Sequence, residues 1–202
     1  MLRAMATSDS TEERREVANR YRRRADAFEA TIVGTPPDRW ASPSPCEKWL
    51  ARDVVAHVVE YTAHVVHGGE AAPTREAPAG FDPLVTFRAS RADVERVLDD
   101  PGTASEIVQE IDLAVSWDLP QHQWDLAMAT GQEAIIDAGD LVALWSALSS
   151  QTPGWWEFMR TPGRFGPGIE VYGPEVSVPD DASLQDRLLG LIGRDPHWTP
   201  PG

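Results

Sequence analysis

Residues 111–131, IDLAVSWDLPQHQWDLAMATG, form the stretch that decides how this chain folds and where its chemistry lies. They place Asp118 and His122 four residues apart, and residues at this spacing lie on one face of a helix. A carboxylate and an imidazole stacked in this way can hold one divalent metal ion when a third ligand comes from another helix. His57, inside an earlier apolar segment, is the candidate for that ligand. Two imidazoles and one carboxylate suit Zn²⁺, and on geometry alone also Fe²⁺ or Ni²⁺.

Pro120 stands between the two candidate ligands and leaves two interpretations of Asp118 open. Proline inside a helix removes one hydrogen bond and clashes with the preceding turn, whereas it is well tolerated at the first helical position. If a helix begins again at Leu119 or Pro120, Asp118 is its N-cap and Gln121 completes a variant of the capping box. If the helix runs through, the carboxylate is available to a metal. Spacing alone favours neither interpretation.

Apolar residues recur at helical spacing in several other segments. The first helix is expected to begin near Ser10 or Thr11 and to bury Val17, Tyr21, Ala25, Phe28 and Ile32. Further helices are expected over residues 49–67, 84–99, 111–129, 139–149 and 182–193. Prolines and glycines are frequent from Thr152 to Pro179, and a short hairpin or an extended tail is expected within residues 163–178.

This pattern predicts an all-α fold, in which four antiparallel helices form a bundle and an irregular C-terminal extension follows. We expect three parts along the chain. Residues 1–10 form a mobile N-terminus, residues 11–151 a metal-binding helical bundle, and residues 152–202 an extension that packs on the bundle. Four tryptophans are interpreted as packing residues, because aromatic side chains bury large areas. They are Trp117, Trp145, Trp155 and Trp156.

Composition narrows the classes of partner. The chain of 202 residues has 42% hydrophobic and 25% charged residues and a formal net charge of −14. Such a surface repels phosphate backbones and anionic lipid, so we expect neither nucleic acid nor a membrane as partner. No apolar run reaches transmembrane length, and the N-terminus lacks a secretory pattern. The single cysteine forms no intramolecular disulfide and fits a reducing cytoplasm, which is the location we expect.

Other polar residues compete with the first site or support it. Glu60 and His64 are four residues apart and lie near the face of His57, so these three residues offer a rival metal site. Asp125 follows His122 by three residues and is placed to accept the second N–H of that imidazole as an outer-sphere partner.

Two further features are interpreted as structural. Six arginines lie between Arg14 and Arg24, and we expect a solvated face paired with the acidic remainder of the molecule rather than a basic docking patch. Cys46 precedes a helix, where a thiol becomes reactive when its pKa falls. We interpret it first as a small packing residue in its loop.

Three segments, in order along the chain, carry a resemblance to a known family. They are RWASPSPCEKWLARDVVAHV at residues 39–58, DLPQHQWDLAMATG at residues 118–131, and FGPGIEV at residues 165–171 with VPDDASLQDRLLGLIGRDPHW at residues 178–198. The first two resemble the metal-binding motifs of mycothiol-dependent maleylpyruvate isomerase relatives, which share the DinB-like four-helix bundle. The third resembles the tail of an uncharacterised actinobacterial subfamily. The motifs are typical of the superfamily and not of one activity.

The resemblance implies a divalent metal, usually zinc, held by His57, Asp118 and His122. It thereby disfavours the rival set with Glu60 and His64. In the isomerase the metal is thought to activate the thiol cofactor mycothiol, because a thiol on Zn²⁺ loses its proton at neutral pH. Addition of the thiolate to an unsaturated diacid permits bond rotation, and elimination then gives the isomer.

These observations give one leading hypothesis and two rivals. The first is a metal-dependent, mycothiol-assisted transferase or isomerase that takes a small-molecule thiol and an unidentified substrate. The second is a non-catalytic small-molecule-binding or stress-response bundle with a degenerate metal site. The observation that suggests it is Pro120. The third is a structural bundle that forms a homodimer through its Trp-rich C-terminal half.

Overall fold

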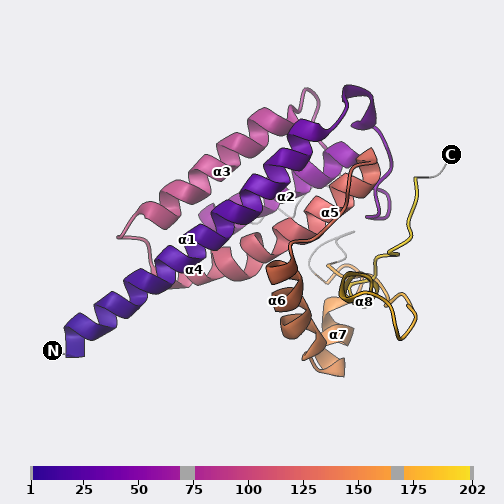
Figure 1. The fold of residues 1–202 in the computed structure, drawn as a ribbon. Helices are drawn as coiled ribbons and strands as arrows, with labels where there is room; N and C mark the ends of the chain where they lie inside the picture. The colour runs from indigo at the N-terminus through magenta and orange to yellow at the C-terminus, as the bar shows by residue number, and fades with distance from the viewer. Residues whose placement is uncertain (1, 69–75, 165–170, 201–202) are drawn as a thin grey trace.

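The computed structural model describes residues 2–68, 76–164 and 171–200, and Figure 1 shows their arrangement. Within those ranges the protein is all-α, without a strand, and has one isolated bridge between Pro43 and Leu50. None of the helices described there is long and apolar enough to cross a membrane. The elements are α1 (Leu2–Gly34), η1 (Pro37–Arg39), α2 (Ala51–His67), α3 (Pro83–Asp99), α4 (Ser105–Glu110), the π-helix η2 (Ile111–Ser116), α5 (Trp117–Thr130), α6 (Ala138–Ser149), α7 (Pro153–Met159) and α8 (Leu184–Leu191).

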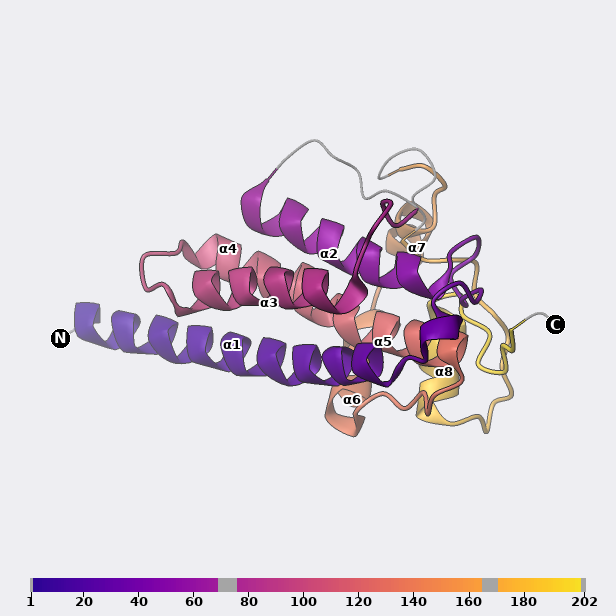
Figure 2. The same cartoon turned by 90° about the horizontal axis from the view of Figure 1, so that it is seen from above.

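Four helices surround the main hydrophobic core. α1 and α2 each pack against both α3 and α5, and α4 and η2 lead into α5 (Figure 2). The five apolar positions predicted for the first helix, from Val17 to Ile32, are all buried in this core. Val54 and Val58 of α2 and Phe87 of α3 join them, as their spacing predicts. Burial of each large side chain of this kind contributes roughly 1.5–3 kcal/mol.

Residues 105–130 form one helical run, in which α4 passes through η2 into α5. The run ends where the sequence predicts, because Gly131 has a φ of 73°, the left-handed conformation that stops helices. Pro120 lies inside α5. It cannot donate to the carbonyl of Ser116, and its ring crowds that carbonyl. Ser116 is the last residue of the wider π-helical turns, so the conflict falls where the helix is already loosened.

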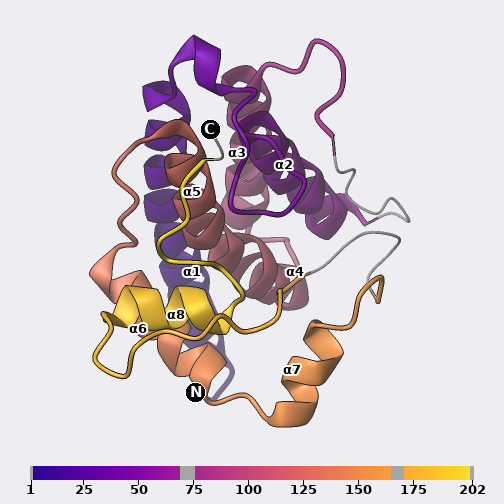
Figure 3. The same cartoon turned by 90° about the vertical axis from the view of Figure 1, so that its right-hand side faces the viewer.

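α5 is covered on a second side by a separate hydrophobic cluster. Leu119 and Leu126 face the main core, whereas Trp124 packs with residues of α6, α7 and α8. Figures 1 and 3 show these three helices gathered on one side of α1 and α5. The four tryptophans predicted to pack do belong to this cluster or lie against it. α6 precedes the expected boundary at residue 151 but shares the cluster with α8, and a division of the chain at residue 151 stays a prediction.

The structure departs from the expected elements at several places, and the helical run that contains α5 begins at Ser105 rather than near residue 111. α1 begins at Leu2 rather than near Ser10, since no proline or glycine interrupts the first ten residues, and its first turns extend beyond the neighbouring helices (Figure 2). The mobility expected for residues 1–10 stays a prediction. Helix α7 was not expected, although Pro153 at its first position and the cap of Thr152 on the Trp155 N–H are start signals. Of the expected hairpin, residues 165–170 lie outside the described residues, and residues 171–178 form no strand.

The six arginines from Arg14 to Arg24 each have a partner, which favours the paired interpretation over a docking patch. Arg24 differs from the expected solvated face, because its side chain is only 1% exposed. It pairs with Asp140 of α6 at 2.8 Å and donates to Ser116 Oγ at 2.9 Å. This buried ion pair ties α6 to α1 and to the end of η2.

Replacement of Asp140 by alanine is expected to destabilise the protein by about 3–5 kcal/mol, because it leaves the buried Arg24 guanidinium without its counter-charge. The matched control is Asp99→Ala, whose pair with Arg22 is exposed and whose loss is expected to cost less than about 1 kcal/mol. Urea unfolding followed by tryptophan fluorescence measures both. Similar losses in the two variants would contradict the prediction.

Candidate metal centre

The position of His57 follows from how α2 begins. Asp53, the third residue of α2, is buried. Its Oδ2 accepts the Leu50 N–H at 2.8 Å, and its Oδ1 accepts the Ala77 N–H at 2.8 Å. The first of these bonds is the acidic half of a capping box, and the second ties the start of α2 to the segment before α3. His57 lies one turn further along, and its side chain is 14% exposed.

α5 places Asp118 and His122 on the face that meets His57. Asp118 Oδ2 lies 3.4 Å from His122 Nε2 and 3.9 Å from His57 Nε2. One ligand atom from each of the three residues lies within 4.8 Å of the others. The structure thus brings together the three side chains that the sequence indicated as ligands.

Two polar atoms of this cluster lack a hydrogen-bond partner within the described part of the chain. Asp118 Oδ2 and His57 Nδ1 are buried and have no hydrogen-bond partner among the described residues. Buried polar atoms are normally paired, and the Asp118 oxygen, which lies near Nε2 of both histidines, is the one that a metal held between these three atoms would satisfy. Ligand atoms bound to a tetrahedral zinc ion at its usual bond lengths are about 3.3 Å apart. The 3.4 Å separation between Asp118 and His122 is close to that value.

Asp118 is not a helix cap. α5 continues η2 without a break, and the residue at its N-terminal boundary is Ser116, which makes no side-chain cap. Gln121, the other member of the suggested capping box, donates its Nε2 to the Trp117 carbonyl at 3.0 Å instead. The N-cap interpretation is therefore wrong, because the π-helical turns accommodate Pro120 and no new helix has to start. The carboxylate remains available as a ligand.

A layer of hydrogen bonds lies behind His122. Its Nδ1 is 3.0 Å from Asp125 Oδ2, the contact expected of an outer-sphere partner. Asp125 is fully buried, and Arg194 from the C-terminal extension donates Nε to Oδ1 at 2.9 Å and Nη2 to Oδ2 at 3.1 Å. The Cys46 thiol also donates to Asp125 Oδ2, at 3.0 Å. With its Nδ1 bonded to Asp125, the imidazole presents Nε2 to Asp118 and to a metal.

Burial and charge set opposite protonation states on the two histidines. For His122, burial lowers the pKa, but the charge of Asp118 and the hydrogen bond to Asp125 outweigh it, so the pKa lies well above its ordinary value. For His57, burial and the neighbouring His122 hold the pKa well below its ordinary value. Burial also raises the pKa of the Asp118 carboxyl. His57 is thus neutral, as a metal ligand has to be, and a metal that bound His122 would have to displace a proton from it.

Aromatic rings line the cluster. The ring centroid of Trp49 lies 4.6 Å from that of His57, and Tyr61 stacks on His57 at 5.9 Å with an interplanar angle of 5°. Tyr172 packs with Trp155 and Trp156 of the second cluster and is close enough to Asp118 to be affected by its charge. Burial and the charge of Asp118 raise the pKa of both Tyr61 and Tyr172 to about 12. Both phenols therefore keep their protons at neutral pH and can act as hydrogen-bond donors.

Cys46, His122 and Asp125 form another group of three potential ligands. Their atoms already bond one another, and Arg194 donates to both Cys46 Sγ, at 3.2 Å, and Asp125. The positive charge of the Arg194 guanidinium would repel a metal ion bound between Cys46 and Asp125. Burial raises the pKa of the Cys46 thiol, whereas ligation needs the thiolate. The group with His57 and Asp118 is the better metal site, and the burial of Cys46 agrees with a packing role.

The rival set of His57, Glu60 and His64 receives no support. Within the described ranges, no group of three potential ligands includes Glu60 or His64. His64 is exposed, and seven residues of helix separate it from His57 by about 10 Å along the axis. That distance is too long for two ligands of one ion.

Arg194 and Tyr172 were not singled out from the sequence, and neither were Trp49 and Tyr61, whose rings lie against His57. Arg194 directly follows Gly193, a glycine at the end of α8 that signals a helix stop. Such a signal locates a turn, but it does not say that the next side chain reaches α5. For Tyr172 the local sequence offers no signal, because it lies in an irregular segment rich in proline and glycine.

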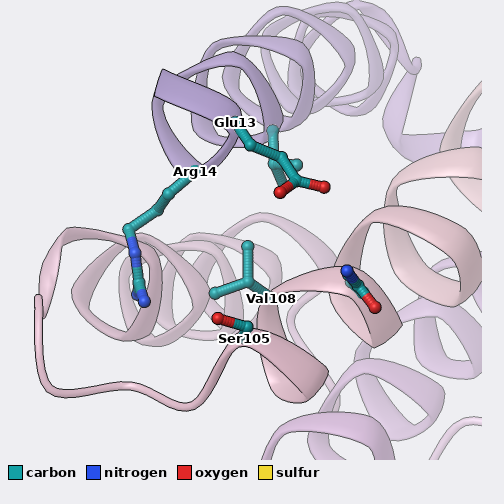
Figure 4. A pocket seen from close by; sticks show the side chains of 6 residues that line it. Glu13, Arg14, Ser105 and Val108 are labelled. Atoms are coloured by element: carbon teal, nitrogen blue, oxygen red, sulfur yellow. The ribbon is translucent and has the colours of Figure 1, made fainter. Parts of the chain in front are cut away.

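A small open pocket lies elsewhere, between the N-terminal half of α1 and α4 (Figure 4). Its lining consists of Glu13, Arg14, Val17, Ser105, Val108 and Gln109. None of the candidate ligands is among them, and one acidic side chain alone makes no metal site. We therefore place the chemistry at the histidine cluster and not in this pocket.

Comparison with known proteins gives relatives but no function. The chain is 29% identical over 184 residues to two proteins of Mycobacterium tuberculosis that are named only as uncharacterised, Rv0738 of strain H37Rv and MT0763 of strain CDC 1551. The aligned region covers 86% of this chain and 95% of each relative. No family model and no solved structure matches the chain.

Metal affinity is expected to rise with pH. Below the raised pKa of His122, each bound ion displaces one proton from that imidazole, so the dissociation constant falls about tenfold per pH unit. His57 is already neutral, so metal binding releases no proton from it. The stability of the metal-free fold changes with pH in the opposite direction to metal affinity. A histidine whose pKa is raised in the folded state stabilises that state below the unfolded pKa of about 6.5. That contribution is lost as the pH rises through the folded-state pKa.

Zinc titrations between about pH 6 and pH 8, the range around the ordinary histidine pKa, measure this proton linkage. Thermal unfolding of the metal-free protein over the same range measures the contribution of His122 to the fold. A dissociation constant that does not change with pH would contradict the assignment of the displaced proton to His122.

Proposed function

We propose that this protein binds a divalent metal ion, zinc, through His57, Asp118 and His122 in a DinB-like four-helix bundle made of α1, α2, α3 and α5. The observation that carries the proposal is the buried Oδ2 of Asp118, which lies near two imidazole nitrogens and has no hydrogen-bond partner among the described residues. The resemblance of residues 39–58 and 118–131 to the metal-binding motifs of the superfamily supports the same three ligands.

Three protein ligands suit a catalytic zinc site, because structural zinc sites have four. The nearest further candidates, Cys46 and Asp125, lie behind His122 and are bonded to Arg194. The fourth position is therefore left to water or to a small molecule. The Asp118 side chain is 24% exposed although its Oδ2 is buried, so the cluster lies close below the surface.

The activity that fits this arrangement best is a metal-dependent, thiol-assisted transfer or isomerisation, with mycothiol or a related small thiol as co-substrate. Zinc would lower the pKa of a bound thiol so that it reacts as the thiolate. Trp49 and Tyr61 would flank the reactants. The protonated phenols of Tyr61 and Tyr172 would donate hydrogen bonds to a substrate oxygen. The cytoplasm is the proposed location, since it keeps small thiols reduced.

A second candidate function is a non-catalytic bundle that binds a small molecule at a degenerate metal site. The observation in its favour is the state of Asp125. This carboxylate is the base nearest to His122, but Arg194 and Cys46 occupy its oxygens, and the charge of Arg194 overcomes burial to hold its pKa well below the ordinary range. It is therefore a poor proton acceptor, and a binding protein needs none. A homodimer through the C-terminal half also remains a proposal.

Purified protein is expected to contain one metal ion per chain, and His57→Ala and His122→Ala are each expected to lose it, because two ligands hold zinc too weakly to survive purification. Elemental analysis gives the ion and its stoichiometry. The matched controls are Cys46→Ser and His64→Ala, one from each rival group, and both are expected to keep the metal. Stoichiometric metal that survives both His57→Ala and His122→Ala would rule out this site.

Addition of a small thiol to the cobalt-substituted protein is expected to produce a sulfur-to-cobalt charge-transfer band and to change the visible spectrum of the ion. The reason is that a thiolate takes the open fourth position. Cobalt-loaded Cys46→Ser serves as control and is expected to respond like the wild type, since the sulfur comes from the added thiol. A spectrum that no thiol changes would favour the non-catalytic candidate.

A further inference from the structure

We propose that Arg194 is a positioning residue of the metal centre, which holds Asp125 in the orientation that aims His122 at the metal. Metal affinity would then depend on the C-terminal extension as well as on the bundle. This inference rests on the proposed metal site, and it goes beyond that site by assigning a role to a segment that supplies no ligand.

Arg194 donates two hydrogen bonds to Asp125, one to each carboxylate oxygen. Nε donates to Oδ1 at 2.9 Å and Nη2 donates to Oδ2 at 3.1 Å. A planar guanidinium bound to both oxygens fixes the plane of the carboxylate and not only its charge. The Asp125 side chain is 0% exposed and that of Arg194 is 14% exposed, so water competes little for these bonds.

The plane of the Asp125 carboxylate decides where the His122 ring points. Oδ2 of Asp125 lies 3.0 Å from Nδ1, and Nε2 on the far side of the ring lies 3.4 Å from Asp118 Oδ2. The other partner of Asp125 is the Cys46 thiol at 3.0 Å, which is a weak donor. Among the described residues, Arg194 is the one strong anchor of the carboxylate apart from the ring itself, and without it the ring loses its fixed direction.

The end of α8 delivers Arg194 to this point. Gly193 has a φ of 83°, its N–H donates to the Gly190 carbonyl at 3.0 Å, and the Arg194 N–H donates to the Leu189 carbonyl at 2.8 Å. These are the two bonds of the Schellman motif. A Cβ on Gly193 would come within 2.6 Å of the Gly173 backbone, so glycine is required there for space as well as for φ. Arg194 is thus carried by a packed helix end, and Figure 3 shows the segment after α8 passing beside α5.

Arg194 also joins the loop that precedes α2. Its Nη2 donates to Cys46 Sγ at 3.2 Å, across 148 residues of sequence. The guanidinium therefore connects three segments that surround His122: this loop, α5 and the extension. If Arg194 only stabilised the extension, it would not need to contact Asp125, the hydrogen-bond partner of His122.

Cobalt binding by the full-length protein tests the proposal, with Co²⁺ itself as the probe. The variants are Arg194→Met, which removes the fork and the charge, and Arg194→Lys, which keeps a positive charge beside Asp125 but not the bidentate geometry. The matched control is Arg160→Met. Arg160 belongs to the same extension, donates to the Leu191 carbonyl at 2.6 Å, lies 4.4 Å from the ring centroid of Trp156 and pairs with Glu175 at 3.8 Å, and none of these partners belongs to the candidate metal centre.

Arg194→Met is expected to raise the dissociation constant for Co²⁺ about 10- to 100-fold, the usual effect of losing an outer-sphere partner. The visible spectrum of the cobalt that still binds is expected to change, because the His122 nitrogen no longer approaches from a fixed direction. Arg194→Lys is expected to lie between this variant and the wild type. Arg160→Met is expected to keep the wild-type affinity and spectrum. If Arg194→Met does not fold, Arg194→Lys carries the test.

Wild-type affinity and spectrum in the Arg194 variants that fold would overturn the proposal. An equal loss of affinity in Arg160→Met would also overturn it, since the effect would then come from a loosened extension. Absence of cobalt binding by the wild-type protein is a different result, because it would defeat the proposed metal site itself.

Discussion

Asp125 carries a negative charge at 0% exposure, and a buried charge is tolerated only when opposite charge and hydrogen bonds replace the lost water. The guanidinium of Arg194, the imidazole of His122 and the Cys46 thiol provide that replacement. Each comes from a different part of the chain, so the three parts must be in place together before the charge is satisfied. This requirement links the loop before α2, the bundle and the C-terminal extension into one structure, and it fixes the tautomer of His122.

The second constraint is the course of the helical run from α4 to α5. A regular α-helix would have to end or kink at Pro120, but the π-helical turns of η2 precede it and leave Asp118 and His122 in phase on one face. α5 then serves two hydrophobic clusters at once, with Leu119 and Trp124 on different sides. Burial on both sides holds the helix rigidly, and a metal site built on such an element is more precise than one on a loop.

The electrostatics of the site separate its two sides. Behind His122, the charges of Arg194 and Asp125 cancel and the hydrogen bonds are complete, so neither a metal nor a substrate gains by entering there. In front of it, Asp118 keeps an oxygen without a partner, and His57 is held neutral. The atoms that still lack a hydrogen-bond partner among the described residues therefore lie on the side that also holds the aromatic rings. This asymmetry fits a metal with an open position, and it is also compatible with a simple binding site, because the two potential bases there, Asp118 and His57, are the candidate metal ligands.

Local features of this protein follow from its sequence. The apolar period from Val17 to Ile32 and the glycine stop at Gly131 depend on neighbours a few residues away, and the all-α class and most helix boundaries follow from them. The spacing of Asp118 and His122 likewise placed both on one helix face, and His57 was found from its apolar helix and a motif resemblance. Tertiary structure decided the rest. Local signals could not choose between cap and ligand for Asp118, because the answer depends on π-helical turns that packing stabilises. Nor could they show Arg194 beside Asp125, since that contact spans 69 residues and arises only when α8 packs against the second cluster.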